Sequence, residues 1–227
     1  MARFSSLEVY NTILEQGLVP VFYNKNFDIA RKIVECIAKG GGKIVEFTNR
    51  GDFAYDVFTK LVKYFEKEKP QLIFGVGSVI DPYTAALYIN NGASFVVGPL
   101  LNPSIAKLCN RRRIPYCPGC GTPSEISKAE ELGCEIIKIF PAGELGGPKF
   151  AKAILAPMPW VKLMPTGGVN ITEENINAWF DAGVIALGIG SKLITKEYIE
   201  SENWGKIEEN IARTLTLIKK FKNQKIG

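Results

Sequence analysis

The sequence contains no histidine among its 227 residues. This absence excludes Ser-His-Asp and Cys-His catalysis, most catalytic zinc sites and the usual general base near neutral pH. An enzyme with this composition has to use Lys, Glu, Asp, Tyr, Cys or backbone groups. Five cysteines are present, and an odd number without a secretory signal predicts reduced thiols.

The sequence also has no apolar run close to the roughly 20 residues that a membrane-spanning helix needs. Residues 1–17 lack the apolar core of a signal peptide. The net charge of +5 is mild, and no nucleic-acid recognition motif accompanies it. We therefore expect a cytoplasmic protein that binds neither membranes nor nucleic acids and that has a modest attraction for anionic metabolites.

A second cysteine pair is missing as well. Cys117 and Cys120 form one CxxC motif, but neither another CxxC nor a histidine is available to complete a zinc site. Thr122 and Glu125, which follow, have the spacing of a helix capping box. The sequence favours neither a metal nor a redox site here, and it leaves the roles of Cys117 and Cys120 open.

What the sequence does contain is a regular alternation of short apolar runs and longer amphipathic segments, without a linker. Helices are predicted near residues 5–16 and 203–222. Eight strands are predicted between them, at 18–23, 43–48, 71–76, 94–98, 114–117, 135–140, 160–165 and 185–190.

Strands that alternate with helices predict parallel βαβ units, and eight such units close into a barrel. An open doubly wound sheet is the alternative, but no GxGxxG follows the first strand, where the sequence reads VFYNKNFD. We therefore expect an α/β fold: one (β/α)8 TIM-barrel domain over residues 1–227, with an extra N-terminal helix.

Lys138 stands in the apolar run 135–140, where a charge is costly. Strand residues alternate between the barrel interior and the helix layer, so if Ile137 and Ile139 face the helices, Lys138 points inward. The same alternation turns Glu46 inward from the second strand. The two could meet as a buried structural ion pair, or they could serve amine catalysis. Desolvation favours a neutral, nucleophilic amine, and a nearby carboxyl group can move protons.

Polar groups and glycines follow several of the predicted strands. The loops after strands seven and eight of such a barrel commonly bind phosphate through backbone N–H groups. Their glycines could instead serve only as tight turns. The expected phosphate ligands are Gly167, Gly168, Gly190 and Ser191.

Two further residues stand at the same predicted rim. Arg50 follows the second strand and Ser78 the third, and these side chains suit recognition of a carboxylate. For Arg50, the plain alternative is an exposed loop cation.

Several motifs occur together in one order along most of the chain, from residue 17 to residue 193. The sequence resembles the 2-keto-3-deoxy-6-phosphogluconate (KDPG) aldolase family, which includes the 4-hydroxy-2-oxoglutarate (KHG) aldolases. The resemblance rests on VPV (19–21), GGKIVEFTNR (41–50), FGVGSV (74–79), PGCGTPSE (118–125), KIFPAGELGGPKFAKA (138–153), PTGGV (165–169) and GIGSKL (188–193).

The resemblance implies a class I aldolase in a homotrimeric (β/α)8 barrel that needs neither a metal nor another cofactor. Lys138 matches the Schiff-base lysine and Glu46 the general acid and base. The expected substrate is KDPG, cleaved to pyruvate and glyceraldehyde 3-phosphate, with KHG as a further substrate cleaved to pyruvate and glyoxylate. The residues that match the pyruvyl carboxylate site are Arg50, Ser78, Pro99 and Phe140, and those that match the phosphate site are Gly167, Gly168, Gly190 and Ser191.

Three departures from the family pattern leave the exact substrate open. Ser78 stands where many relatives carry Thr, Gly98 precedes Pro99 in place of Ser, and Tyr23 stands where some members have Arg. The CPGC loop is similar to that of relatives that act on the galactonate epimer, so the alternative substrate is 2-dehydro-3-deoxy-6-phosphogalactonate. Outside the aldolases, a thiamine-phosphate synthase-like barrel and a non-catalytic, regulatory phosphate-binding barrel are also compatible with the glycine turns.

Overall fold

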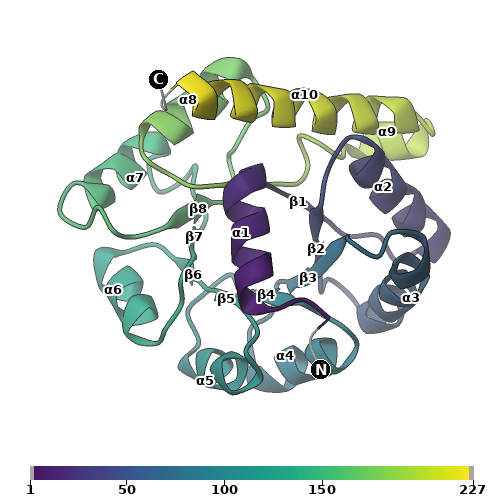
Figure 1. Cartoon of the computed structure of the whole chain (residues 1–227), viewed down its shortest axis with the longest axis horizontal. Coiled ribbons are helices and arrows are strands. Elements are labelled where there is room, and N and C mark those ends of the chain that lie inside the picture. The colour runs from purple at the N-terminus through teal and green to yellow at the C-terminus, as the bar shows by residue number, and fades with distance from the viewer. Residues whose placement is uncertain (1–2, 225–227) are drawn as a thin grey trace.

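The computed structural model describes residues 3–224, and its parallel strands form the closed barrel of Figure 1. Six strands pair in the order β5-β4-β3-β2-β1-β9, and three pair in the order β6-β7-β8. The strands are β1 (Leu18–Phe22), β2 (Ile44–Thr48), β3 (Ile73–Gly77), β4 (Phe95–Val97), β5 (Tyr116–Cys117), β6 (Gly119–Cys120), β7 (Ile137–Ile139), β8 (Leu163–Pro165) and β9 (Leu187–Ile189).

Two links join these sheets into one ring of eight barrel strands. β5 and β6 are a single barrel strand interrupted at Pro118, and a parallel bridge between Thr166 and Gly188 connects β8 to β9. The predicted (β/α)8 barrel is therefore confirmed, while the strand predicted at 114–117 is wrong in its bounds. Proline has no N–H to donate to the ladder, although the Pro118 carbonyl still accepts a 2.9 Å hydrogen bond from the Lys138 N–H.

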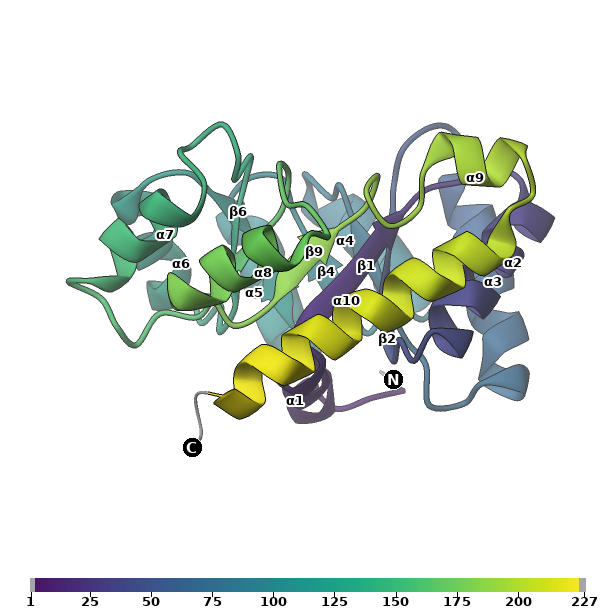
Figure 2. The ribbon, with the colours of Figure 1, turned by 90° about the horizontal axis from the view of Figure 1, so that it is seen from above.

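The helices surround the barrel, and each barrel strand is followed by one that returns the chain to the same end (Figure 2). They are α1 (Ser6–Gln16), α2 (Phe27–Lys39), α3 (Ala54–Glu68), α4 (Pro82–Asn90), α5 (Pro103–Arg112), α6 (Pro123–Glu131), α7 (Pro148–Leu155), α8 (Glu173–Asp181), α9 (Lys196–Glu200) and α10 (Trp204–Gln224).

The predicted N-terminal helix, α1, crosses the end of the barrel where the strands begin (Figures 1 and 2). Ser5 caps α1 in a capping box with Glu8, and Gly17 ends it in the left-handed conformation. Val9 and Ile13 of α1 are fully buried against side chains of the barrel interior. The helix therefore covers this end of the barrel.

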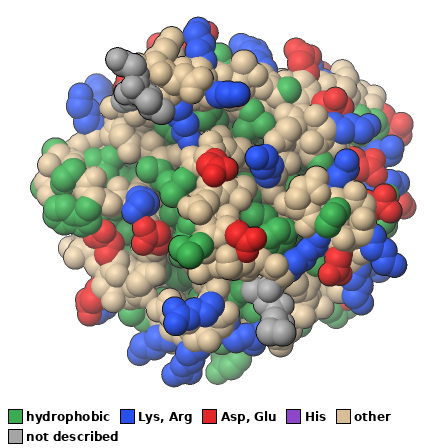
Figure 3. Space-filling view, viewed as in Figure 1, with side chains coloured by type: hydrophobic (Ala, Val, Ile, Leu, Met, Phe, Trp, Pro, Cys, Tyr) green, Lys and Arg blue, Asp and Glu red, His purple; other side chains and the backbone are tan. Residues whose placement is uncertain are grey.

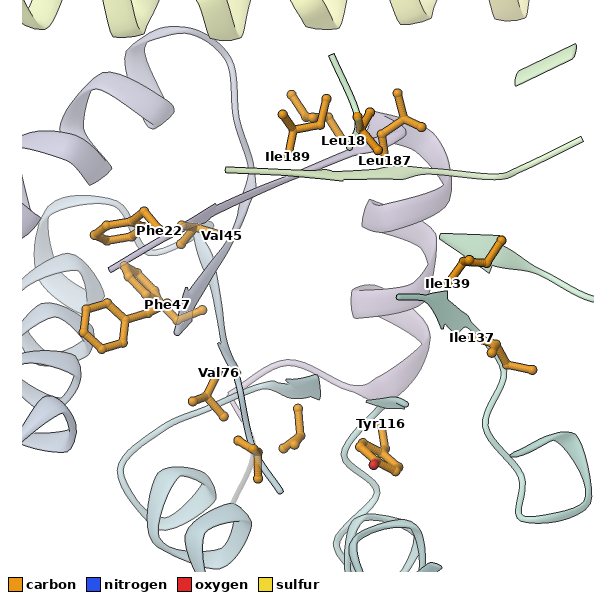
Figure 4. Packing of buried hydrophobic residues seen from close by; sticks show 14 of the residues in the cluster. Leu18, Phe22, Val45, Phe47, Val76, Tyr116, Ile137, Ile139, Leu187 and Ile189 are labelled. Atoms are coloured by element: carbon orange, nitrogen blue, oxygen red, sulfur yellow. The ribbon is translucent and has the colours of Figure 1, made fainter. Parts of the chain in front are cut away.

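Alternate residues of the strands pack on opposite sides of the barrel wall. Val45 and Phe47 of β2 and Ile137 and Ile139 of β7 belong to the cluster between the strands and the helices (Figure 4). Ile44 and Ile136 belong to the interior cluster with α1. Each such side chain, once buried, contributes roughly 1.5–3 kcal/mol to stability. The alternation fixes the residues between them, Glu46 and Lys138, on the inner side.

The face that α1 crosses carries Lys and Arg side chains interspersed with Asp and Glu (Figure 3). Between residues 3 and 224, no helix is both long enough and apolar enough to cross a membrane.

Candidate active site

Lys138 lies in the middle of β7, between Gly119 of β6 and Met164 of β8. Only 5% of its surface is exposed. Its Nζ is 4.7 Å from the centre of the Phe140 ring, whose negative face attracts a cation. Burial nonetheless lowers the pKa of Lys138 below the ordinary lysine value, while the nearby Glu46 acts in the opposite direction. A neutral Lys138 amine is therefore more favourable in this site than it would be in water.

Glu46 lies in β2, paired with Val21 of β1 and Gly75 of β3. It is 1% exposed, and its Oε2 is buried without a hydrogen-bond partner. Burial raises its pKa above the ordinary carboxyl value, and the positive charges of Lys138 and Arg50 oppose that rise. A buried carboxyl group with a free oxygen is poised to exchange a proton with a neighbour.

Lys138 and Glu46 are electrostatically coupled but do not touch. Neither takes part in any ion pair within 4.0 Å among residues 3–224, and no hydrogen bond joins them there. A structural ion pair in a dry interior needs direct contact to offset the desolvation of both charges. The lack of a direct ion pair therefore weakens the structural interpretation.

A cavity of about 360 Å³ opens at the end of the barrel where the strands terminate. Arg50 borders it, and the Arg50 N–H donates to the Thr48 carbonyl at 2.9 Å. The neighbouring Asn49 N–H donates to Gly77, and its side chain accepts from Tyr88 Oη at 2.8 Å. These bonds hold the loop after β2 at the rim. The predicted site residues that line the cavity are Arg50, Phe140, Gly167, Gly190 and Ser191.

The other five predicted site residues are not part of the cavity lining: Lys138, Glu46, Ser78, Pro99 and Gly168. Ser78 directly follows β3 and adopts a left-handed φ of 60°, which is uncommon for serine. Pro99 follows β4, and its carbonyl approaches β6 so closely that a Cβ on Gly119 would lie 2.4 Å from the Pro99 oxygen. Since Gly119 pairs with Lys138, the Pro99 backbone lies beside the lysine strand. Gly168 is exposed, with its Cα packed against Gly143.

The two glycine turns place backbone donors at the cavity. Gly167 and Gly168 have φ values of 86° and 77°, a conformation that L side chains rarely adopt. In the part of the chain that the structure describes, the N–H groups of Gly168, Ser191 and Lys192 have no hydrogen-bond acceptor. Free N–H groups at a glycine-lined opening suit an oxyanion.

Two threonines of the cavity lining, Thr48 and Thr166, were not predicted as site residues from the sequence. Thr48 Oγ1 donates to the Phe22 carbonyl at 3.3 Å. Thr166 borders the cavity, and its Oγ1 is buried without a hydrogen-bond partner. The only signal was its place in the PTGGV motif, between two residues assigned to turns. Its hydroxyl can donate or accept one hydrogen bond to a bound molecule.

The CxxC motif does not form a functional pair. Cys117 faces the barrel interior, whereas Cys120 packs toward the helices. Burial raises the pKa of the Cys120 thiol to about 12 and the pKa of Cys117 further still. Among residues 3–224, all five cysteines are free and buried, and no three His, Cys, Asp or Glu side chains group as metal ligands. These thiols are inert, structural groups.

A barrel that buries a desolvated lysine near an unpaired carboxyl group, below a cavity lined with anion donors, has the layout of a lyase that acts through a lysine imine. The family model described as "KDPG and KHG aldolase" matches residues 9–210. The chain belongs to this aldolase family.

Individual relatives agree with that assignment. The chain is 32% identical over 217 residues to a 2-dehydro-3-deoxy-phosphogluconate aldolase of Haemophilus influenzae, covering 95% of this chain and 99% of that one. It is 31% identical to the KHG/KDPG aldolase of Escherichia coli, over 86% of this chain and 90% of that one.

A solved structure is similar over most of the chain as well. The KDPG aldolase of Legionella pneumophila, with pyruvate captured at low pH as a covalent carbinolamine intermediate, superimposes with a TM-score of 0.81. The identity is 28%, and the match covers 89% of this chain and 96% of that one.

Proposed function

We propose that this chain is a class I aldolase that cleaves KDPG to pyruvate and glyceraldehyde 3-phosphate through a Schiff base on Lys138. The observation that carries the proposal is the buried Lys138 amine, whose pKa is lowered by desolvation, near a Glu46 carboxyl group that it does not contact. Membership in the KDPG and KHG aldolase family supports the same chemistry.

In the proposed reaction, the neutral Lys138 amine attacks the C2 carbonyl of the substrate. Glu46 delivers a proton to the carbinolamine oxygen, water leaves, and a protonated imine forms. The imine withdraws the electron pair of the C3–C4 bond, while a base takes the proton of the C4 hydroxyl group. Glyceraldehyde 3-phosphate leaves, the remaining enamine is protonated at C3, and water hydrolyses the imine to pyruvate and free Lys138.

The other residues bind the two ends of the substrate. Arg50, Ser78, the Pro99 backbone and Phe140 surround the pyruvyl half, and an arginine fork suits its carboxylate. The phosphate is held at the opposite end of the cavity by the backbone of Gly167, Gly168 and Gly190 and by Ser191. The free N–H groups and the left-handed glycines of these turns support this placement.

Family membership favours the aldolase over a thiamine-phosphate synthase-like transferase and over a regulatory barrel. The further substrate KHG and the galactonate epimer of KDPG remain candidate substrates of the same mechanism. Tyr23 borders the cavity where some relatives carry a cation. The proposed phosphate site therefore consists of backbone N–H groups and the Ser191 hydroxyl, because the one cationic side chain of the cavity lining, Arg50, is assigned to the carboxylate.

One experiment tests the proposal directly. The folded protein is incubated with pyruvate and reduced with borohydride, and its peptides are mapped by mass spectrometry. The expected result is a reduced pyruvyl adduct on Lys138; its absence would refute the proposal. Cleavage rates for KDPG, its galactonate epimer and KHG, measured side by side, then rank the substrates.

Replacing Arg50 with glutamine should shift the acid limb of the pH profile of adduct formation to higher pH. The Arg50 cation lowers the pKa values of both Lys138 and Glu46, so its removal raises both. A larger fraction of Lys138 is then protonated at a given pH, and the neutral amine appears later on titration. The KM for pyruvate should also rise about 10- to 100-fold, the loss expected for one charge-assisted carboxylate contact. If KM rises while the acid limb of the pH profile does not move, the electrostatic part of this prediction is wrong.

We further propose that the chain forms a homotrimer in the cytoplasm, with residues 1–227 as one barrel domain whose ends, 1–2 and 225–227, lie outside the described residues. Exposed apolar side chains at Phe53, Ile80, Tyr83 and Leu87, in consecutive loops and helices after β2 and β3, support a contact between copies. The free state of the five cysteines supports a reducing compartment. Sedimentation equilibrium should give three times the 25.0 kDa chain mass.

A further inference from the structure

Gly77 is the last residue of β3, and its backbone conformation does not require glycine. Its φ is not among the positive values found in this chain. It lies on the same side of β3 as Ile73, whose side chain belongs to the barrel interior. An alanine could adopt this backbone, so the reason for glycine has to be the space that a side chain would occupy.

The Glu46 carboxyl group fills that space. A Cβ built on Gly77 would lie 1.8 Å from Glu46 Oε1, 2.6 Å from Cδ and 3.0 Å from Cγ. In the ladder Glu46 pairs with Gly75. Thr48 and Gly77 form the pair two residues further toward the end of the strands. The glutamate side chain therefore leans along β2 toward the cavity and crosses onto β3 at Gly77.

No protein group described in the structure hydrogen-bonds the Glu46 carboxyl group. No hydrogen bond to either of its oxygens occurs among residues 3–224, and Oε2 is buried without a partner. A buried carboxyl group usually owes its orientation to donors around it. Here the neighbouring strands supply only a gap of matching size.

We propose that Gly77 is a positioning residue: its missing side chain forms a slot that holds the Glu46 carboxyl group in reach of the group bound to Lys138. The inference rests on the proposed aldolase function. Proton transfer requires the acid and its target to be within hydrogen-bond reach, so a carboxyl group expelled from the slot loses most of its effect. Gly77 itself touches no substrate atom and acts only through Glu46.

A similar contact occurs between β8 and β9. A Cβ on Gly188 would lie 2.2 Å from Thr166 Oγ1, which is buried without a hydrogen-bond partner. In both places a glycine on the adjacent strand makes room for a polar side chain.

The test compares Gly77→Ala with Gly75→Ala. Both changes add one methyl group to the inner side of β3, but the methyl at residue 75 meets the Phe95 ring, 2.2 Å from its nearest carbon, instead of Glu46. Gly77→Ala should lower kcat for KDPG cleavage about 100-fold with little change in KM, the cost of a displacement of about 1 Å. Gly75→Ala should lower thermal stability and leave kcat per folded molecule within a few-fold.

A readout independent of turnover follows the carboxyl group itself. In carbon-13 NMR titrations of glutamate-labelled protein, the Glu46 pKa should fall toward the ordinary value in Gly77→Ala, since the displaced group gains solvent, and should stay raised in Gly75→Ala. An unchanged Glu46 pKa in folded Gly77→Ala would overturn the inference.

A second test asks whether a shorter side chain at residue 46 restores activity to Gly77→Ala. Glu46→Asp shortens the side chain by one methylene, so aspartate fits beside a methyl group at residue 77. In a double-mutant cycle, the Gly77→Ala/Glu46→Asp variant should be at least about tenfold more active than independent effects predict. Additive effects of the two substitutions would overturn the proposal that Gly77 forms a slot for Glu46. If wild-type protein forms no pyruvate adduct, the aldolase proposal fails, while the NMR titration still decides whether Gly77 positions Glu46.

Discussion

Replacing Lys138 with methionine should abolish the borohydride-trapped pyruvate adduct and lower kcat for KDPG cleavage by about 10⁴-fold or more, as loss of a covalent nucleophile does in other enzymes. Methionine keeps most of the lysine volume, so the interior around β7 remains filled. The control is Lys162→Met, which removes a half-buried lysine paired with Glu135 at 2.6 Å just before β8. It should keep full activity and full adduct formation.

The fold should survive this change because Glu46 can become neutral. Lys138 is the main influence that opposes the raised pKa of Glu46, so its loss raises that pKa further and favours the protonated acid. A carboxyl group whose pKa is higher in the folded state contributes stability below its unfolded value of about 4.3, and this stability is lost as pH rises through the folded pKa. The thermal unfolding temperature of Lys138→Met should therefore be nearest to wild type below about pH 4 and fall as pH rises above that value. Retained cleavage in a folded variant would contradict the assignment of the nucleophile.

Glu46→Gln should lower kcat by about 10²- to 10⁴-fold, the range for loss of a general acid or base. Glutamine has nearly the same shape and fits the same space beside Gly77, but it cannot carry a proton between the amine and the substrate oxygen. The adduct with pyruvate should still form, more slowly, because Lys138 remains. In D₂O, exchange of the pyruvate methyl protons should slow by a similar factor, since it requires protonation of the enamine.

A matched control for Glu46→Gln is Glu144→Gln, an exposed carboxylate in the loop that follows the lysine strand. It should leave both cleavage and methyl exchange unchanged. If Glu46→Gln slows cleavage while methyl exchange stays at the wild-type rate, Glu46 would not be the group that protonates the enamine.

The sequence predicted the orientation of Lys138 and Glu46 because each stands between apolar residues that alternate with it. Only one alternation buries Ile137 and Ile139 against helices, and it sends Lys138 inward. The same reasoning could not give the separation of the two side chains, because that depends on strand register and tilt around a closed ring. A direct pair and a gap are equally compatible with the sequence pattern.

The glycines show a second limit of sequence reasoning. Those at 167 and 168 could be assigned to a turn, since they follow a strand and carry a motif. Gly77 and Gly188 lie inside or at the end of strands, where a glycine usually indicates weak packing or a bulge. Their partners, Glu46 and Thr166, are 31 and 22 residues away in sequence, and only the folded barrel brings them together. Likewise, the break at Pro118 could not be told from a strand end without the neighbouring β7.

Because α1 covers the end of the barrel where the strands begin, we expect the substrate to enter and leave at the end where the strands terminate. In the proposed reaction the pyruvyl half is bonded to Lys138 in β7, and we expect the aldehyde half to lie nearer the end where the strands terminate. Entry and release at the same end would impose an order of binding and release. The aldehyde has to be released before pyruvate, and in the synthetic direction pyruvate has to bind first. Steady-state kinetics should accordingly show pyruvate as a competitive product inhibitor of cleavage and glyceraldehyde 3-phosphate as a noncompetitive one.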